Sequence, residues 1–213
     1  MSILLTSAGL TSALWFLGRG TGIVALLMFT LTVVLGVVTR SGQRGLGLTR
    51  FGIADLHRTA ALAGVGLVLV HVLTLLFDPF AQLHMVDLIL PFHAGYRPLW
   101  VGLGALAVDA LMVLVGSSLL RKKIGPRTFK ALHWLAYAMW PLAFLHGLGT
   151  GTDAATWWFR GLAAACALAV TAAVGWRVSE HFHLHGRPRL DRKALPRESG
   201  LHGPGVNGLT HHG

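Results

Sequence analysis

Five stretches of apolar residues, each long enough to cross a lipid bilayer, restrict the fold of this chain more than any other feature. A helix needs roughly 18 to 20 apolar residues to span about 30 Å of hydrocarbon. Only 12% of the 213 residues are charged, about half the share in soluble domains. We therefore predict an all-α, polytopic transmembrane bundle of about five helices. Its expected spans lie near Leu14–Val38, Leu56–Phe77, Trp100–Leu120, Ala131–Leu148 and Trp157–Trp176.

Basic residues gather in alternate connections between these spans. The net charge of +10 could suggest a nucleic-acid partner, but Lys and Arg follow the first span, the third span and the fifth span instead of marking one soluble face. By the positive-inside rule these connections are cytoplasmic. We expect an N-terminus outside, a C-terminus in the cytoplasm, contact with membrane lipid and no nucleic acid. The expected location is the inner (plasma) membrane.

The composition of the chain changes near residue 179, where apolar sequence gives way to polar residues, prolines and glycines. We predict a transmembrane bundle over residues 1–178 and a flexible cytoplasmic tail over 179–213. The first eighteen residues carry no Lys or Arg, so a secretory signal peptide is not expected. Cys166 is the one cysteine, which leaves no partner for an intrachain disulfide.

Four histidines lie at the ends of the second and fourth expected spans. His57 and His71 are 14 residues apart, and His133 and His146 are 13 apart, which is roughly 20 Å along a helix. Both spans run in the same direction, because one crossing separates them. His57 and His133 should therefore share the inner level, and His71 and His146 the outer level. Two imidazoles at one depth can supply both axial ligands of a haem iron.

The two spacings differ in how well they fit an ideal helix. Two side chains 14 residues apart on an α-helix point within about 40° of the same direction, whereas two side chains 13 residues apart differ by about 140°. The fourth span must therefore depart from ideal winding, and Pro141 is a residue at which a helix can kink.

Other roles for these histidines stay open at this stage. An intramembrane histidine can bond to a neighbouring helix or relay protons. A zinc ion fits less well, because its ligands must converge on one point. A non-redox membrane component, such as a transporter or assembly partner, is the alternative function.

These segments resemble a known family. The sequences LHRTAALAGVGLVLVH (Leu56–His71) and LHWLAYAMWPLAFLH (Leu132–His146) are similar to the ferric-reductase-like transmembrane domain. Ferric reductases, NADPH oxidases and the membrane haem subunit of bacterial methionine sulfoxide reductase share this haem-bearing core. WFLGRGTG (Trp15–Gly22) resembles its first core helix in bacterial members, and the resemblance covers about residues 15–177.

The resemblance implies two haem b groups, ligated by His57 with His133 and by His71 with His146, and electron transfer across the membrane. The oxidases and eukaryotic ferric reductases continue into an FAD- and NADPH-binding module, but this sequence has no strand–glycine-loop–helix pattern. We expect an oxidoreductase component whose donor is a separate cytoplasmic flavoprotein or a membrane quinol. Its acceptor would be extracytoplasmic, and a quinone or a partner's flavin are further cofactor candidates.

Several charged and polar residues are secondary candidates. Arg19 lies near the outer end of the first span, where it could pair with propionates of the outer haem or reach the interface. Arg58 and Lys130 could meet the inner propionates, and Arg160 is expected to snorkel. Asp109 could relay protons or tune a haem. Histidines of the outer connection and of the tail could bind a metal. Those histidines are His84, His93, His181, His183 and His185.

Overall fold

The computed structural model describes residues 2–41, 49–79 and 81–179 of the chain. All the regular structure in these residues is helical, so the predicted all-α bundle is confirmed. The predicted tail lies almost wholly outside the described residues. The elements are α1 (Ser2–Ser41), α2 (Arg50–Phe77), α3 (Met85–Ile89), α4 (Pro98–Leu119), α5 (Arg121–His133), α6 (Leu135–Thr150), the short 3₁₀ helix η1 (Thr152–Ala155) and α7 (Trp157–Val178).

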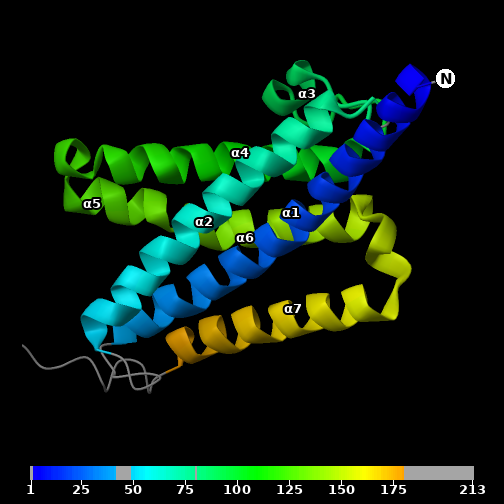
Figure 1. The fold of residues 1–213 in the computed structure, drawn as a ribbon. Helices are drawn as coiled ribbons and strands as arrows, with labels where there is room; N and C mark the ends of the chain where they lie inside the picture. The colour runs from blue at the N-terminus through cyan, green and yellow to red at the C-terminus, as the bar shows by residue number, and fades with distance from the viewer. Residues whose placement is uncertain (1, 42–48, 80, 180–213) are drawn as a thin grey trace, which may run out of the picture.

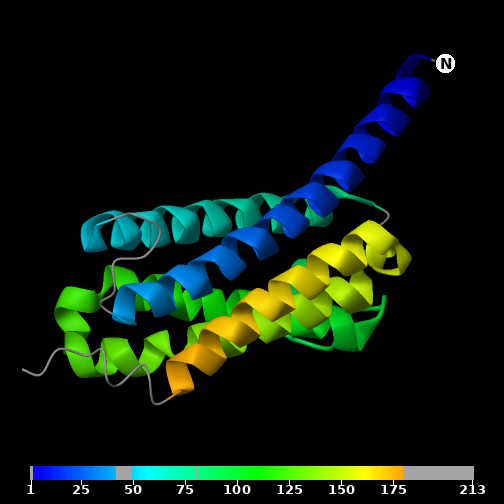
Figure 2. The ribbon, with the colours of Figure 1, turned by 90° about the horizontal axis from the view of Figure 1, so that it is seen from below.

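Four helices in the described residues are long and apolar enough to cross a membrane. They match the first, second, third and fifth expected spans. The stretches that meet this condition are Ser12–Arg40, Phe51–Phe77, Pro98–Leu119 and Trp157–Val178. Helix α1 has 40 residues, about 60 Å at 1.5 Å per residue, and its first turns project beyond the other helices (Figure 2).

The fourth expected span is divided between α5 and α6. Gly125 has a left-handed backbone (φ 76°) that breaks α5, and the chain then returns along α4 through the rest of α5 and through α6. The helical pattern is interrupted once more at Trp134, directly after His133, whereas α6 runs through Pro141 without interruption. Residues 126–150 together extend about 37 Å, enough to cross the same thickness as α4.

The helices pack as two long pairs, α1 along α2 and α4 along α6, with α7 against α1 (Figure 1). Helices α2 and α6 have no extensive backbone contact with each other. The buried core joins α1, α4, α6 and α7, and it includes Phe29, Leu111, Met139, Trp140 and Cys166. One polar contact crosses this core: the indole N–H of Trp140 donates to the hydroxyl of Thr30, 3.0 Å away.

The fold places the α4–α5 turn and η1 at opposite ends of the bundle (Figure 1), so orientation can be tested directly. Cysteine would be introduced at Lys123 or Thr152, both exposed, in a Cys166→Ala background. By the positive-inside rule, an impermeant maleimide should label Thr152→Cys in intact cells and Lys123→Cys only after the cytoplasmic side is opened. The reverse pattern would show that the N-terminus is cytoplasmic.

Candidate functional site: two histidine pairs between the helix pairs

The four histidines meet two by two: His71 of α2 faces His146 of α6, and His57 of α2 faces His133, the last residue of α5. We call His57 with His133 the inner pair and His71 with His146 the outer pair, after their predicted orientation. The ring centroids are 6.4 Å apart in each pair, with interplanar angles of 65° in the inner pair and 85° in the outer pair. The structure therefore brings together the same residues that the spacing pairs.

The residues around Trp134, between His133 and His146, are wound more tightly than an α-helix. The amide of Trp134 bonds to the carbonyl of Ala131, and the amide of Tyr137 bonds to the carbonyl of Trp134. Both bonds join residues three apart, as in a 3₁₀ helix, which turns about 20° more per residue than an α-helix. Extra winding has the sense that the 13-residue spacing requires, and at about 20° per residue one such turn supplies part of the missing rotation of about 140°. The interruption lies at Trp134 and not at Pro141, where the sequence suggested it.

Three of the four imidazoles are anchored to a backbone carbonyl of the adjacent helix. Nδ1 of His57 lies 2.9 Å from the carbonyl oxygen of Thr32. Nδ1 of His71 lies 2.6 Å from that of Gly18, and Nδ1 of His146 lies 2.8 Å from that of Trp100. A carbonyl oxygen can only accept, so Nδ1 carries a proton in each ring, and in the neutral imidazole Nε2 then has the lone pair. Metal-binding histidines are commonly oriented by such a bond, which also raises the basicity of the ligating nitrogen.

His133 has different surroundings. Its ring stacks on Phe129, with centroids 5.4 Å apart, and the guanidinium groups of Arg40 and Arg177 act on it electrostatically. Arg177 also lies over the ring of Trp134, 4.6 Å from the centroid. Sequence reasoning instead selected Arg58 and Lys130 as cations of this level, and both are exposed.

A cavity of about 430 Å³ surrounds the outer pair. Its wall is mostly apolar and includes Phe29 and Met139, while its polar part includes His71, His146, Arg19 and Asp153. A predominantly apolar cavity with a few convergent polar groups is the usual form of a cofactor site. The described residues contain no group of three or more His, Cys, Asp or Glu side chains placed to hold a metal ion, so the pairs offer two protein ligands each.

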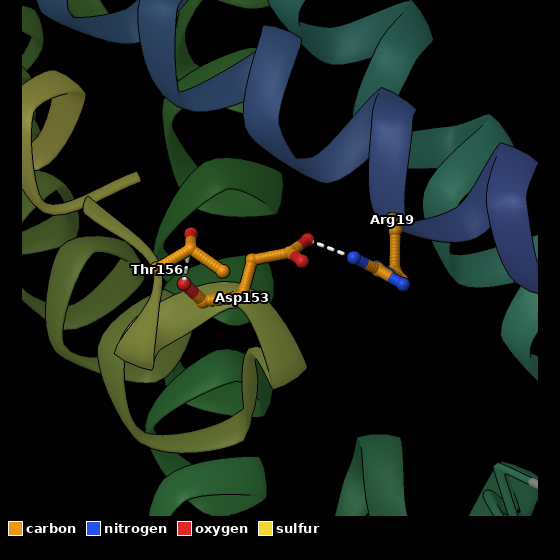
Figure 3. Close-up of polar contacts among 3 residues, drawn as sticks. All are labelled: Arg19, Asp153 and Thr156. Carbon is orange, nitrogen blue, oxygen red and sulfur yellow. Dashed lines mark hydrogen bonds and ion pairs between the residues drawn. The ribbon is translucent and has the colours of Figure 1, made fainter. Parts of the chain in front are cut away.

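Arg19 reaches across the cavity to Asp153. Its guanidinium donates to the carboxylate of Asp153, which lies in η1 (Figure 3). The two side chains are 30% and 16% exposed, so both charges are largely withdrawn from solvent. The hydroxyl of Thr156 bonds to the backbone carbonyl of Asp153 and holds this turn. Asp153 was not predicted as a partner, although it is the only acid between the last two spans.

The other secondary candidates lie outside this site. Asp109 and His93 are exposed, and neither lines the cavity. The backbone N–H of His84 donates to the carboxylate of Asp87, 2.9 Å away, in the outer connection. Arg160 is exposed and donates to the carbonyl of Ala154. The tail histidines lie outside the described residues.

These features define a multi-pass helical membrane protein in which two pairs of histidines meet between the helices. The family model described as "Ferric reductase like transmembrane component" matches residues 21–144, more than half of the chain, and the chain belongs to this family. The match includes His57, His71 and His133 and ends two residues before His146. No curated protein and no solved structure matches the chain. Membership of this family suggests electron transfer across a membrane.

The Arg19–Asp153 pair should stabilise the outer end of the bundle. Removing one partner leaves a partly buried charge uncompensated, so Arg19→Gln and Asp153→Asn should each lower the unfolding temperature in detergent. The double variant should lose less unfolding free energy than the two single variants together, and the difference, the coupling energy, should be about 0.5–2 kcal/mol. Arg160→Gln, a change at an exposed arginine at the same end, is the control and should change stability by less than about 0.5 kcal/mol. Additive single effects would show that the pair contributes nothing.

Proposed function

We propose that this chain carries electrons across the membrane through two b-type haems, one held by the inner pair and one by the outer pair. When bound, a b-type haem supplies one-electron redox chemistry at its iron. The observation that carries the proposal is the centroid distance of 6.4 Å in both pairs. The ligands would be His57 with His133 and His71 with His146.

The distance fits two axial bonds to one iron. A metal bond to an imidazole nitrogen is about 2 Å long, and the nitrogen lies about 1.1 Å from the centre of a five-membered ring whose bonds measure about 1.33 Å. Two imidazoles that face each other across a metal should thus have centroids about 6.2 Å apart. Protonation at Nδ1 in His57, His71 and His146 supports the same arrangement, because it leaves Nε2 free to ligate.

The two pairs lie at different depths, which supports transport between membrane faces. Fourteen residues of α2 separate His57 from His71, about 21 Å along the helix. The protein's part is to ligate, space and orient the two cofactors and to keep water from the outer one. Arg19 is a candidate to meet the propionates of the outer haem, in exchange for or together with Asp153. Arg40 and Arg177 are candidates at the inner level.

The proposed donor is a cytoplasmic flavoprotein or a membrane quinol, and the proposed acceptor is extracytoplasmic. The basic surface at the His133 end supports an acidic or anionic donor, because Arg40 and the Lys122–Lys123 pair are exposed there. The chain would then be the membrane component of an oxidoreductase in the inner (plasma) membrane. The two donors can be distinguished by comparing how a quinol reduces the purified protein with how NADH and a flavoprotein reduce it. Reduction by the quinol alone would favour the membrane donor.

An optical spectrum tests the cofactor directly. The purified protein should show the sharp alpha band of low-spin haem after dithionite reduction, and a pyridine haemochromogen assay should give about two haems per chain. A folded protein without colour would refute the proposal and favour a non-redox role for the histidines.

Single-ligand variants test the pairing. His71→Ala and His146→Ala should each leave about one haem per chain, the inner one, because each removes an axial ligand of the outer site only. His57→Ala should instead spare the outer haem, and His84→Ala is the control that should keep both. Redox titration identifies the haem that remains. If His71→Ala and His146→Ala removed different haems, the pairing would be wrong.

A further inference from the structure

Each anchored imidazole lies against a glycine of the neighbouring helix. A Cβ atom added to Gly22, Gly36 or Gly104 would meet the ring of His71, His57 or His146, respectively. The closest ring atoms would be 2.8, 3.2 and 2.5 Å from that Cβ. All three distances are shorter than ordinary van der Waals contact of about 3.5–4.0 Å between carbon atoms, so each ring occupies the place of a missing side chain.

The acceptor carbonyl always belongs to the residue four positions before the glycine. Gly18 precedes Gly22, Thr32 precedes Gly36, and Trp100 precedes Gly104. In an α-helix each Cα–Cβ bond tilts toward the N-terminus, so a side chain covers the turn before it. A glycine leaves the carbonyl oxygen of that turn open to a second donor, besides the backbone N–H that it accepts within the helix. The imidazole N–H is the second donor here.

The same spacing in sequence separates the glycines on α1 and the histidines on α2. Gly22 and Gly36 are 14 residues apart, as are their carbonyls at Gly18 and Thr32, and 14 residues also separate the histidines that they receive. On α4 the residue 13 positions after Gly104 is Ser117, which is buried and bonds through its hydroxyl to Leu114. His133 has no glycine contact of this kind in the part of the chain that the structure describes.

We propose that Gly22, Gly36 and Gly104 are positioning residues, which hold the imidazoles of His71, His57 and His146 on backbone carbonyls and so set the reduction potentials of the two haems. This inference rests on the proposed function. The bond from Nδ1 raises the basicity of the ligating nitrogen and favours ferric iron. A side chain at any of the three positions displaces its ring from the carbonyl, and the potential of that haem rises.

The test is a spectroscopic redox titration of the purified haem-loaded protein. Gly22→Ala and Gly104→Ala should raise the midpoint potential of the outer haem alone, and Gly36→Ala that of the inner haem alone. The shift should be largest for Gly104→Ala, where the added Cβ is closest to the ring. Loss of only the corresponding haem also supports the proposal, because it shows that the same imidazole has been displaced.

Matched controls lie on the same two helices. A Cβ at Gly20 of α1 or at Gly116 of α4 meets nothing within 4 Å, so Gly20→Ala and Gly116→Ala should leave both potentials unchanged. Equal shifts in the controls, a shift of the wrong haem, or unchanged potentials in all three test variants would overturn the positioning role. If Gly104→Ala does not fold, Gly36→Ala decides, because its added Cβ lies 3.2 Å from the ring and requires the least displacement. Wild-type protein without two haems would instead refute the proposed function.

Discussion

A hydrogen bond from an imidazole N–H to a backbone carbonyl of the adjacent helix is the interaction on which this structure depends. An unsatisfied N–H is costly in a bilayer, and helical carbonyls are usually covered by the next turn's side chains. The bond therefore requires close approach of two helices at a glycine. It joins α1 to α2 twice and α4 to α6 once. The two helix pairs are fixed internally, and the histidines meet between α2 on one side and α5 and α6 on the other.

The two ends of this space differ in character. The outer pair faces a mainly apolar cavity that is lined also by the Arg19–Asp153 ion pair. Around the inner pair, His133 lies among cations and aromatic rings, with Arg177 over Trp134. Positive charge favours the reduced form of an iron centre and attracts anionic partners. The exposed basic residues at the His133 end agree with an anionic donor there, on the donor side of the proposed function.

The return of the chain along α4 shows how local backbone irregularity serves this geometry. Gly125 breaks α5 with a left-handed conformation, and the turn around Trp134 is wound more tightly than an α-helix. That tightening reduces the difference in direction between His133 at the end of α5 and His146 in α6. The irregular turn lies beside a candidate ligand, where bundles commonly concentrate their departures from regular helix. Trp140, bonded to Thr30 in the core, fixes the middle of the same segment against α1.

The sequence by itself determined the helical class and four of the spans, because hydropathy depends only on the order of the residues. Its spacing also predicted that His57 would lie near His133 and His71 near His146, as the ring distances have it. It could not determine that the fourth span divides at Trp134, that Arg19 meets Asp153, or that Gly22, Gly36 and Gly104 receive the imidazoles. Those features depend on how helices rotate about their axes and on which carbonyl a side chain reaches. Only packing between distant segments fixes these two properties, because isolated helices leave both free.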